Sequence, residues 1–299
     1  MTNRTYAAAH FALELEGCEG VGLFRSIEGG GVRTDVMTYQ HGAGYDRWHQ
    51  LGKPKFEDIK LQVGMSMSGP FYTWISDFFD GTCTRKNGAI VAADFHNNER
   101  ARREFTDAMI KELTFPKLDG SDKSAAYMTV GLAVETISFK KGSGSQLAPP
   151  GGFESQKRWT CSNFRFHVDG FAQYCKRISK VDSFTIKQTV IEHHVGGQRW
   201  PIKTPSGVEF PNLAFYIPES DVDPFLEHFK KQAIKGQPPA RLTGQIEIYD
   251  NGMKDTLFTL HFAGADILGI TPDRSDASTE DIKQVKVELH TEKMTFEYA

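Results

Sequence analysis

The stretch KFEDIKLQVGMSMSGPFYTWISDFFDG, from Lys55 to Gly81, contains a predicted strand followed by an aromatic helix. A second stretch, EFPNLAFYIPESDVDPFLEHFKKQAIKG, from Glu209 to Gly236, has the same order. Ile59 aligns with Leu213, and a proline near the start of the helix follows in both stretches. Because self-similarity at a fixed distance indicates repeated structural units, this pair of stretches predicts that the fold is built twice.

Four further pairs of segments support the repeat, and they occur in the same order in both halves of the chain. They are His10–Gly17 with Asn163–Gly170, Thr84–Phe95 with Ala240–Asn251, Ala108–Asp122 with Ala265–Asp276, and Tyr127–Phe139 with Ile282–Phe296. Identity within each pair is low. The shared order and the small drift in spacing nevertheless predict an internal duplication.

The segment between the two copies, Lys141 to Thr160, combines a Gly/Ser alternation with a Pro-Pro and a Gly-Gly pair. This composition is typical of a flexible linker. We therefore predict a first domain over residues 1–140, a flexible linker over 141–160, and a second domain over 161–299.

Within each copy, apolar residues recur at every second position, as in Leu13 and Leu15 or Val285 and Val287. This period indicates half-buried strands that turn one face toward a core. Each copy also contains one predicted helix. The predicted fold class is mainly β, with two tandem antiparallel β-barrels or sandwiches and one flanking helix in each.

Aromatic side chains recur at helical spacing in both predicted helices. They are Phe71, Trp74 and Phe78 in the first copy, and Phe225 and Phe229 in the second. Such a stripe is typical of a helix whose apolar face is buried. We expect these five side chains to pack each helix against its barrel.

The composition excludes several classes of function. The chain has 299 residues, and its 35 basic and 38 acidic residues leave a net charge of −3 at pH 7, so no dominant charge favours nucleic acid or an anionic membrane as partner. It contains no run of the roughly 18–20 apolar residues that span a bilayer and no recognisable signal peptide. We expect cytoplasmic synthesis, no membrane insertion, and reduced cysteines, because no C-x-x-C pair occurs.

No constellation of residues indicates catalysis or a bound metal. His193 and His194 are neighbours, and neighbours on a strand point to opposite faces. His41 and His49 have no cysteine or carboxylate nearby at a recognisable metal-ligand spacing. We therefore predict no metal, no cofactor and no enzyme activity.

Two other motifs have structural explanations. Gly29-Gly30-Gly31 opens no helix after a strand, and no Gly-Lys-Ser/Thr follows, so we interpret it as a turn. Arg100, Arg102 and Arg103, flanked by two glutamates, predict a solvated turn or an ion-pair site between subunits. The functional alternative for this cluster is the lining of a lumen.

The first copy resembles the tail tube proteins of contractile phages and of phage-derived contractile injection systems. Its motifs in the family's order are GVGLFRSIEGGGVRTDVMTYQHGAG (Gly20–Gly44), KFEDIKLQVGMS (Lys55–Ser66), the helix with a tryptophan (Phe71–Phe79) and RKNGAIVAAD (Arg85–Asp94). The second copy is a weaker match. His228 stands in place of Trp74, and the Gly-rich turn is reduced to Lys180–Ser183.

This resemblance implies a barrel subunit that joins its sheets edge to edge into a ring of six, with rings stacked into a hollow tube. It also implies tube, sheath or baseplate proteins as neighbours in a phage-tail-like particle. The segment Gln40–Lys55 corresponds to the family's loop toward the next ring. We therefore expect Tyr45, Arg47, Trp48 and His49 to form an assembly surface.

Two copies in one chain change the expected stoichiometry, because the family's usual subunit has one domain. Three chains of two barrels each would form a pseudo-sixfold ring, similar to the trimeric hub proteins of such tails, and six chains are the alternative. Another class of function is a soluble double β-domain that binds a carbohydrate or other ligand. Tyr45 and Trp48 would then be its aromatic platform.

Overall fold

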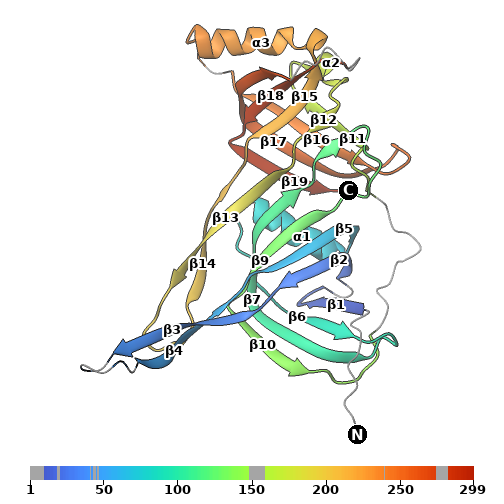
Figure 1. Cartoon of the computed structure of the whole chain (residues 1–299). Coiled ribbons are helices and arrows are strands. Elements are labelled where there is room, and N and C mark those ends of the chain that lie inside the picture. The colour runs from blue at the N-terminus through green and yellow to red at the C-terminus, as the bar shows by residue number, and fades with distance from the viewer. Residues whose placement is uncertain are drawn as a thin grey trace.

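The computed structural model describes residues 10–18, 21–40, 42, 45, 47–147, 159–238, 240–273 and 282–299. Antiparallel strands make up most of these residues, and helices are few (Figure 1). The predicted mainly β fold class is therefore confirmed. One large sheet is built mostly from the N-terminal half, residues 10–147, and a second mostly from the C-terminal half, residues 159–299.

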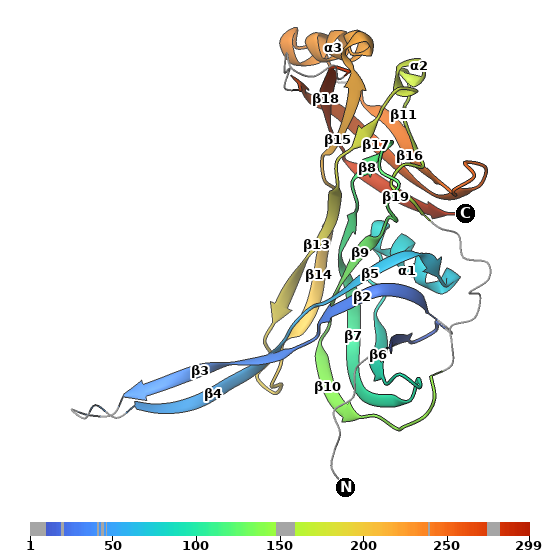
Figure 2. The same ribbon diagram turned by 45° about the vertical axis from the view of Figure 1, so that its right-hand side comes forward.

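The sheet of the N-terminal half has the strand order β1-β6-β7-β9-β5-β2, with β10 beside β7. These strands are β1 (His10–Leu15), β2 (Gly22–Gly29), β5 (Ile59–Met67), β6 (Lys86–Ala93), β7 (Glu99–Phe115), β9 (Met128–Ala133) and β10 (Thr136–Lys141). The sheet curls toward a barrel (Figure 2). Leu61, Leu113 and Val130 are fully buried inside it, as the period-two pattern requires.

The sheet of the C-terminal half has the order β11-β16-β17-β18-β15-β12-β8, with β19 beside β17. Its strands are β8 (Leu118–Asp119), β11 (Phe164–Val168), β12 (Lys180–Val181), β15 (Leu213–Pro218), β16 (Leu242–Tyr249), β17 (Thr256–Pro272), β18 (Gln284–His290) and β19 (Lys293–Tyr298). The short strand β8 comes from the N-terminal half. Phe215, Phe258 and Val287 are fully buried in this sheet.

Two hairpins project from the molecule, and the second of them joins the N-terminal sheet through β7 (Figures 1 and 2). They are β3 (Val32–Gln40) with β4 (Arg47–Phe56), and β13 (Phe184–His193) with β14 (Ile202–Glu209). The described helices are α1 (Gly69–Phe79), α2 (Ala172–Cys175) and α3 (Asp223–Phe229). A 3₁₀ turn at Glu219–Asp221 precedes α3, and a π-helical turn at Lys230–Ile234 continues it.

The two sheets correspond strand by strand. The path β1-β6-β7-β9-β5-β2 matches β11-β16-β17-β18-β15-β12, and β10 and β19 lie beside the long strand in each sheet. Both long strands, β7 and β17, have 17 residues. The segments paired by sequence lie on corresponding elements of the two sheets.

Two glycines hold corresponding places in the sheets, Gly88 on β6 and Gly244 on β16. A Cβ atom at Gly88 would lie 2.3 Å from the Glu14 carbonyl oxygen and 2.5 Å from Cζ of Phe105. A Cβ atom at Gly244 would lie 2.2 Å from a carbonyl oxygen of β11 and 2.4 Å from Cζ of Phe262. In both sheets a phenylalanine ring fills the space that a side chain would need, so glycine is required.

The predicted linker lies mostly outside the described residues, since residues 148–158 are not among them. Its described ends are held by the folded halves. The Gly142 N–H donates to the Arg100 carbonyl at 3.0 Å, and Trp159 is buried against the ring of Phe258, with centroids 5.3 Å apart. The domain boundaries stay a prediction.

Candidate assembly surfaces

The β3–β4 hairpin exposes apolar side chains on both of its faces. Val36 is opposite Leu51 in the ladder, and Tyr39 is opposite Trp48. Because Val36 and Tyr39 are three positions apart, the two pairs lie on opposite faces. Between 46% and 68% of the surface of these four residues is exposed. An isolated two-stranded ribbon is marginal in water, and exposed apolar side chains on both faces favour a partner.

The predicted assembly residues lie on this hairpin. Arg47, Trp48 and His49 begin β4, and Tyr45 lies at the tip with its whole surface exposed. His49 Nδ1 lies 3.3 Å from the Thr38 hydroxyl across the ladder. The expectation of a loop over residues 40–55 is wrong, because residues 47–56 form a strand.

Ion pairs and a turn hold the base of the hairpin. Arg33 pairs with Glu57, and Lys55 Nζ lies 2.7 Å from the Asp35 carboxylate, a hydrogen bond that raises the pKa of Lys55. Gly29, the last residue of β2 before the turn to β3, has φ +83°, and a Cβ atom there would lie 2.1 Å from a backbone oxygen. The Gly-rich motif therefore forms the turn that sets the direction in which the β3–β4 hairpin leaves the sheet. His41 lies outside the described residues.

Helix α1 is packed against the C-terminal half. Its Tyr72 stacks on Tyr298 of β19 with ring centroids 4.0 Å apart, and its Phe79 stacks on Phe296 at 5.9 Å. The Ser76 hydroxyl donates to the Phe296 carbonyl at 3.2 Å. The apolar pattern of the helix did not reveal this contact, because it shows that a face is buried without showing what covers it.

The five aromatic residues predicted to pack the helices differ in burial. Phe71, Trp74 and Phe78 have at most 3% of their surface exposed, and the Trp74 indole donates to the Thr84 carbonyl at 2.8 Å. On α3, Phe225 is fully buried and stacks on Phe171 at 4.5 Å, whereas Phe229 is only partly buried. The face of α1 toward β19 was not predicted.

Strand pairing forms a second contact between the halves. β13 pairs with β7, so that Phe184 lies opposite Phe115 and Ile186 lies opposite Leu113. The rings of Phe115 and Phe184 stack with centroids 5.0 Å apart. We call the α1–β19 and β7–β13 contacts together the internal joint. Through it, each half covers an edge or face that the other would leave exposed.

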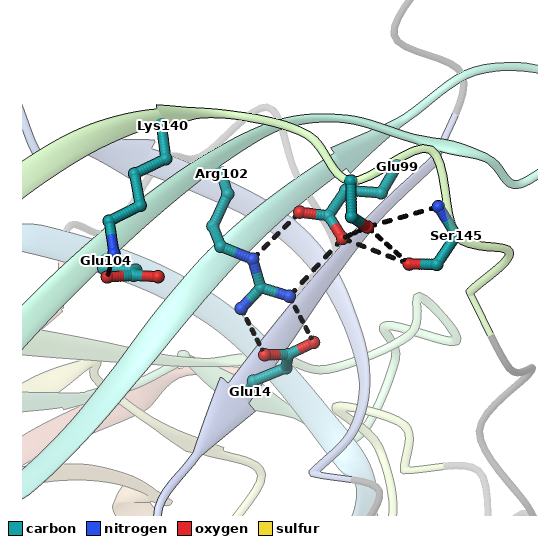
Figure 3. Close-up of polar contacts among 7 residues, drawn as sticks. Glu14, Glu99, Arg102, Glu104, Lys140 and Ser145 are labelled. Carbon is teal, nitrogen blue, oxygen red and sulfur yellow. Dashed lines mark hydrogen bonds and ion pairs between the residues drawn. The ribbon is translucent and has the colours of Figure 1, made fainter.

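A network of polar contacts connects strands β1 and β7 of the N-terminal sheet (Figure 3). Arg102 lies between Glu14 of β1, at 2.6 Å, and Glu99, at 2.9 Å. Glu99 is buried and also accepts a hydrogen bond from the Ser143 hydroxyl at 2.8 Å. The hydrogen bond from Arg102 is the main cause that lowers the pKa of Glu99, and the hydrogen bond to Glu14 is the main cause that raises the pKa of Arg102.

This basic cluster is not a turn, and its role as an ion-pair site between subunits stays a prediction. Arg100, Arg102 and Arg103 lie on strand β7. Arg100 Nη2 lies 2.6 Å from the Asp94 carboxylate, and Arg103 donates to the Gly29 carbonyl at 2.8 Å. The expectation of a solvated turn is therefore wrong, because these residues lie on a strand and their side chains form hydrogen bonds and ion pairs within the chain.

A matching pair of an acidic and a basic side chain occurs in each half. Lys140 of β10 lies 2.6 Å from Glu104 of β7, and His261 of β17 lies 3.1 Å from Glu297 of β19. Both pairs run diagonally across the ladder with the same offset. The acidic residue lies on β7 in the first pair and on β19 in the second, so the pair keeps its position while the two residue types exchange strands.

The described residues contain no group of three or more His, Cys, Asp or Glu side chains that could hold a metal ion. All four cysteines are unpaired, and burial raises the pKa of Cys175 to about 11. Among the described helices, none has the length and apolar character to cross a membrane.

Comparison with known proteins gave one family match. The model of the family described as T4-like virus tail tube protein gp19 matches residues 7–138, which is less than half of the chain. No curated protein sequence matches the chain.

Similar solved structures come from contractile injection systems. The sheath–tube complex of the extracellular contractile injection system PVC, in its extended state, is 17% identical, with a TM-score of 0.41, and the match covers 47% of this chain and 94% of that chain. The tube-terminating cap of the anti-feeding prophage is 16% identical, with a TM-score of 0.40 and coverage of 48% and 95%. The anti-feeding prophage baseplate gives 15% identity, a TM-score of 0.35 and coverage of 44% and 89%.

Proposed function

We propose that the chain is a structural subunit of a phage-like contractile tail or injection apparatus, on the premise that residues 7–138 match the model of the T4-like virus tail tube protein family. It self-assembles into rings that form or cap the hollow inner tube. The family match is the observation that carries the proposal, and it confirms the resemblance predicted from the motifs of the first copy. The work of this protein is assembly, and the chain has no catalytic role in the proposal.

The ring consists of three chains, each of which contributes two barrels, giving pseudo-sixfold symmetry. The matching strand order of the two sheets and the equivalent glycines Gly88 and Gly244 support the duplication on which this count depends. The internal joint supports it as well, because it already connects two barrel-like units by shared strands. If the same contact is repeated between chains, each contact rotates the next unit by the same angle. A closed ring forms when these rotations add up to a full turn.

Other copies of this chain are its main partners, together with neighbouring tube, sheath or baseplate proteins. The exposed apolar residues of the β3–β4 hairpin, which include Trp48 and Tyr45, support contact with the next ring. The net charge of −3 suits a surface that meets copies of itself, because strong charge of one sign would repel them. The assembled location is a phage-tail-like particle.

Electron microscopy and native mass spectrometry of the purified protein test this proposal. Rings or tubes are expected, with three chains in each ring. A monodisperse monomer at high concentration would count against an assembly role, and six chains in a ring would refute the trimer.

Substitution of Trp48 separates ring stacking from ligand binding. Trp48→Ala should leave single rings intact and prevent their stacking, because Trp48 is 68% exposed and carries no part of the sheet core. Leu51→Ala, on the opposite face of the same hairpin, tests whether both faces are covered. Tubes of normal length from Trp48→Ala would contradict the role of the hairpin.

A further inference from the structure

Two equivalent strands, β19 and β10, differ in how far they are covered. In the C-terminal half, Phe296 of β19 is 6% exposed because α1 covers it. In the N-terminal half, Phe139 of β10 is 61% exposed. A single exposed apolar side chain is common on a protein surface, and what distinguishes Phe139 is that its counterpart Phe296 is buried.

The strand registers establish that Phe139 and Phe296 are equivalent. Phe139 lies one position beyond Ser138, which is opposite Glu104 of β7, and Phe296 lies one position beyond Thr295, which is opposite His261 of β17. Glu104 and His261 belong to the matching diagonal side-chain pairs. Each precedes the phenylalanine that fills the space over Gly88 or Gly244.

The helices are equivalent as well. Phe71 in α1 and Phe225 in α3 each follow the proline near the helix start and are fully buried. Tyr72, which covers β19, therefore corresponds to Leu226, which is half-buried. Ile234, at the end of the π-helical turn after α3, is 70% exposed. Leu226 and Ile234 are therefore accessible on or just after α3, whereas Tyr72 of α1 is buried against β19.

The strand edges show the same asymmetry. β13 covers the edge of β7 at residues 112–115. On β17 the corresponding residues 269–272 pair with β18 on one side, and no strand among the described residues pairs with them on the other. β3, the counterpart of β13, pairs only with β4 within the described part of the chain. Both open edges are templates for antiparallel pairing.

We propose that β10, with Phe139 at its centre, is the docking surface for α3 of a second copy of this chain, and that β3 pairs with the open edge of β17 at the same interface. The contact between chains reproduces the internal joint, with α3 in the place of α1 and β10 in the place of β19. This inference rests on the proposed ring assembly and specifies its interface. The occupant is a second copy because the same elements already form this contact within one chain.

Within one chain, α3 cannot reach β10. α3 and β10 lie at opposite ends of the molecule (Figures 1 and 2). Each chain therefore presents α3 to one neighbour and β10 to the other, which is a heterologous contact. Every ring then alternates internal joints with joints between chains.

A cross-link across the proposed interface tests it directly. Phe139→Cys and Leu226→Cys are combined in a Cys83→Ser background, because Cys83 is the exposed native thiol. Oxidation of assembled rings should give covalent species larger than one chain, ending at the closed ring. The matched control pairs Leu226→Cys with Phe95→Cys, since Phe95 is 76% exposed on the turn between β6 and β7, and it should stay monomeric on a denaturing gel.

A charge at position 139 gives a second, independent test. Phe139→Asp should lower the fraction of protein in rings at least tenfold, while the thermal midpoint of the isolated chain stays unchanged. Phe95→Asp is the control and should leave rings intact. Rings of the Phe139→Cys, Leu226→Cys variant that give no cross-link on oxidation, or normal ring formation by Phe139→Asp, would overturn this interface and leave ring assembly standing. Absence of rings from the wild-type protein would overturn both.

Discussion

At the scale of single residues, Gly88 and Gly244 are where the two sheets are most alike. We expect Gly88→Ala to lower the free energy of unfolding by about 1–3 kcal/mol, because the new methyl group would overlap a backbone oxygen and a buried ring. Gly244→Ala should cost a similar amount. Gly207→Ala is the control, since no atom lies within 4 Å of its Cβ position. Urea denaturation measures all three, and wild-type stability of Gly88→Ala would contradict the close packing.

The lowered pKa of Asp94 predicts that the free energy of unfolding falls at acidic pH. Its carboxylate accepts hydrogen bonds from the backbone N–H of Asn98 at 3.0 Å and from Arg100. The Asn98 N–H is the main cause that lowers the pKa of Asp94 to about 2. Because the folded pKa lies below the unfolded value of about 4, the charged form stabilises the protein above pH 4, and this contribution is lost as the pH falls toward 2.

The corresponding variant is Asp94→Asn. We expect a lower urea midpoint than wild type at pH 7, and a difference that shrinks between about pH 4 and pH 2 as Asp94 becomes protonated in the wild type. Asp255→Asn, at an exposed position, controls for the loss of one negative charge. A difference that stays constant over this pH range would exclude the Asp94 carboxylate as the titrating group.

At the scale of elements, the contact of α1 with β19 provides a matched pair of substitutions. Phe296→Ala should lower the free energy of unfolding by about 3–5 kcal/mol, because it leaves a cavity beneath Phe79 and Tyr72. Phe139→Ala, at the equivalent exposed position, should change it by less than about 0.5 kcal/mol in the isolated chain. Equal effects at the two positions would show that their different burial has no energetic consequence.

The predictability of the elements follows from burial. Strands with one buried face, such as β1 and β18, were predicted because their apolar residues alternate. The β4 strand was predicted as a loop, because RWHQLGKPKF has no buried face to impose that period and contains Gly52 and Pro54. The helices were predicted from their aromatic stripes. The partner of α1 was not, because Tyr72 and Phe79 contact residues more than 200 positions away in the sequence.

At the scale of the whole molecule, the internal joint predicts cooperative unfolding. Buried residues of both halves form one continuous core cluster, and β7–β13 pairing crosses between the halves. We expect a single calorimetric transition whose van't Hoff and calorimetric enthalpies agree. Two resolved transitions in the monomeric chain would contradict the energetic role of the joint.

The assembly surfaces were only partly predictable at this scale. Tyr45, Arg47, Trp48 and His49 could be proposed because aromatic residues beside arginine favour interfaces. Phe139 could not be proposed as an assembly residue, because the sequence pattern of its strand is that of any half-buried strand. Its exposure is known only from the structure, in which α1 covers Phe296 of β19 and no helix of the same chain covers Phe139 of β10 among the described residues. The surface of β10 around Phe139 can be recognised only by comparing it with the covered strand β19 in the structure.

Strand β7 has a mechanical consequence. It forms backbone hydrogen bonds with β6, β9, β10 and β13, so strands of both halves are attached to one continuous stretch of 17 residues. These bonds lie perpendicular to the strand. A load along β7 is therefore shared by all of them at once, rather than opening them one after another. A thrust on one barrel would reach the other through this strand without passing through a hinge.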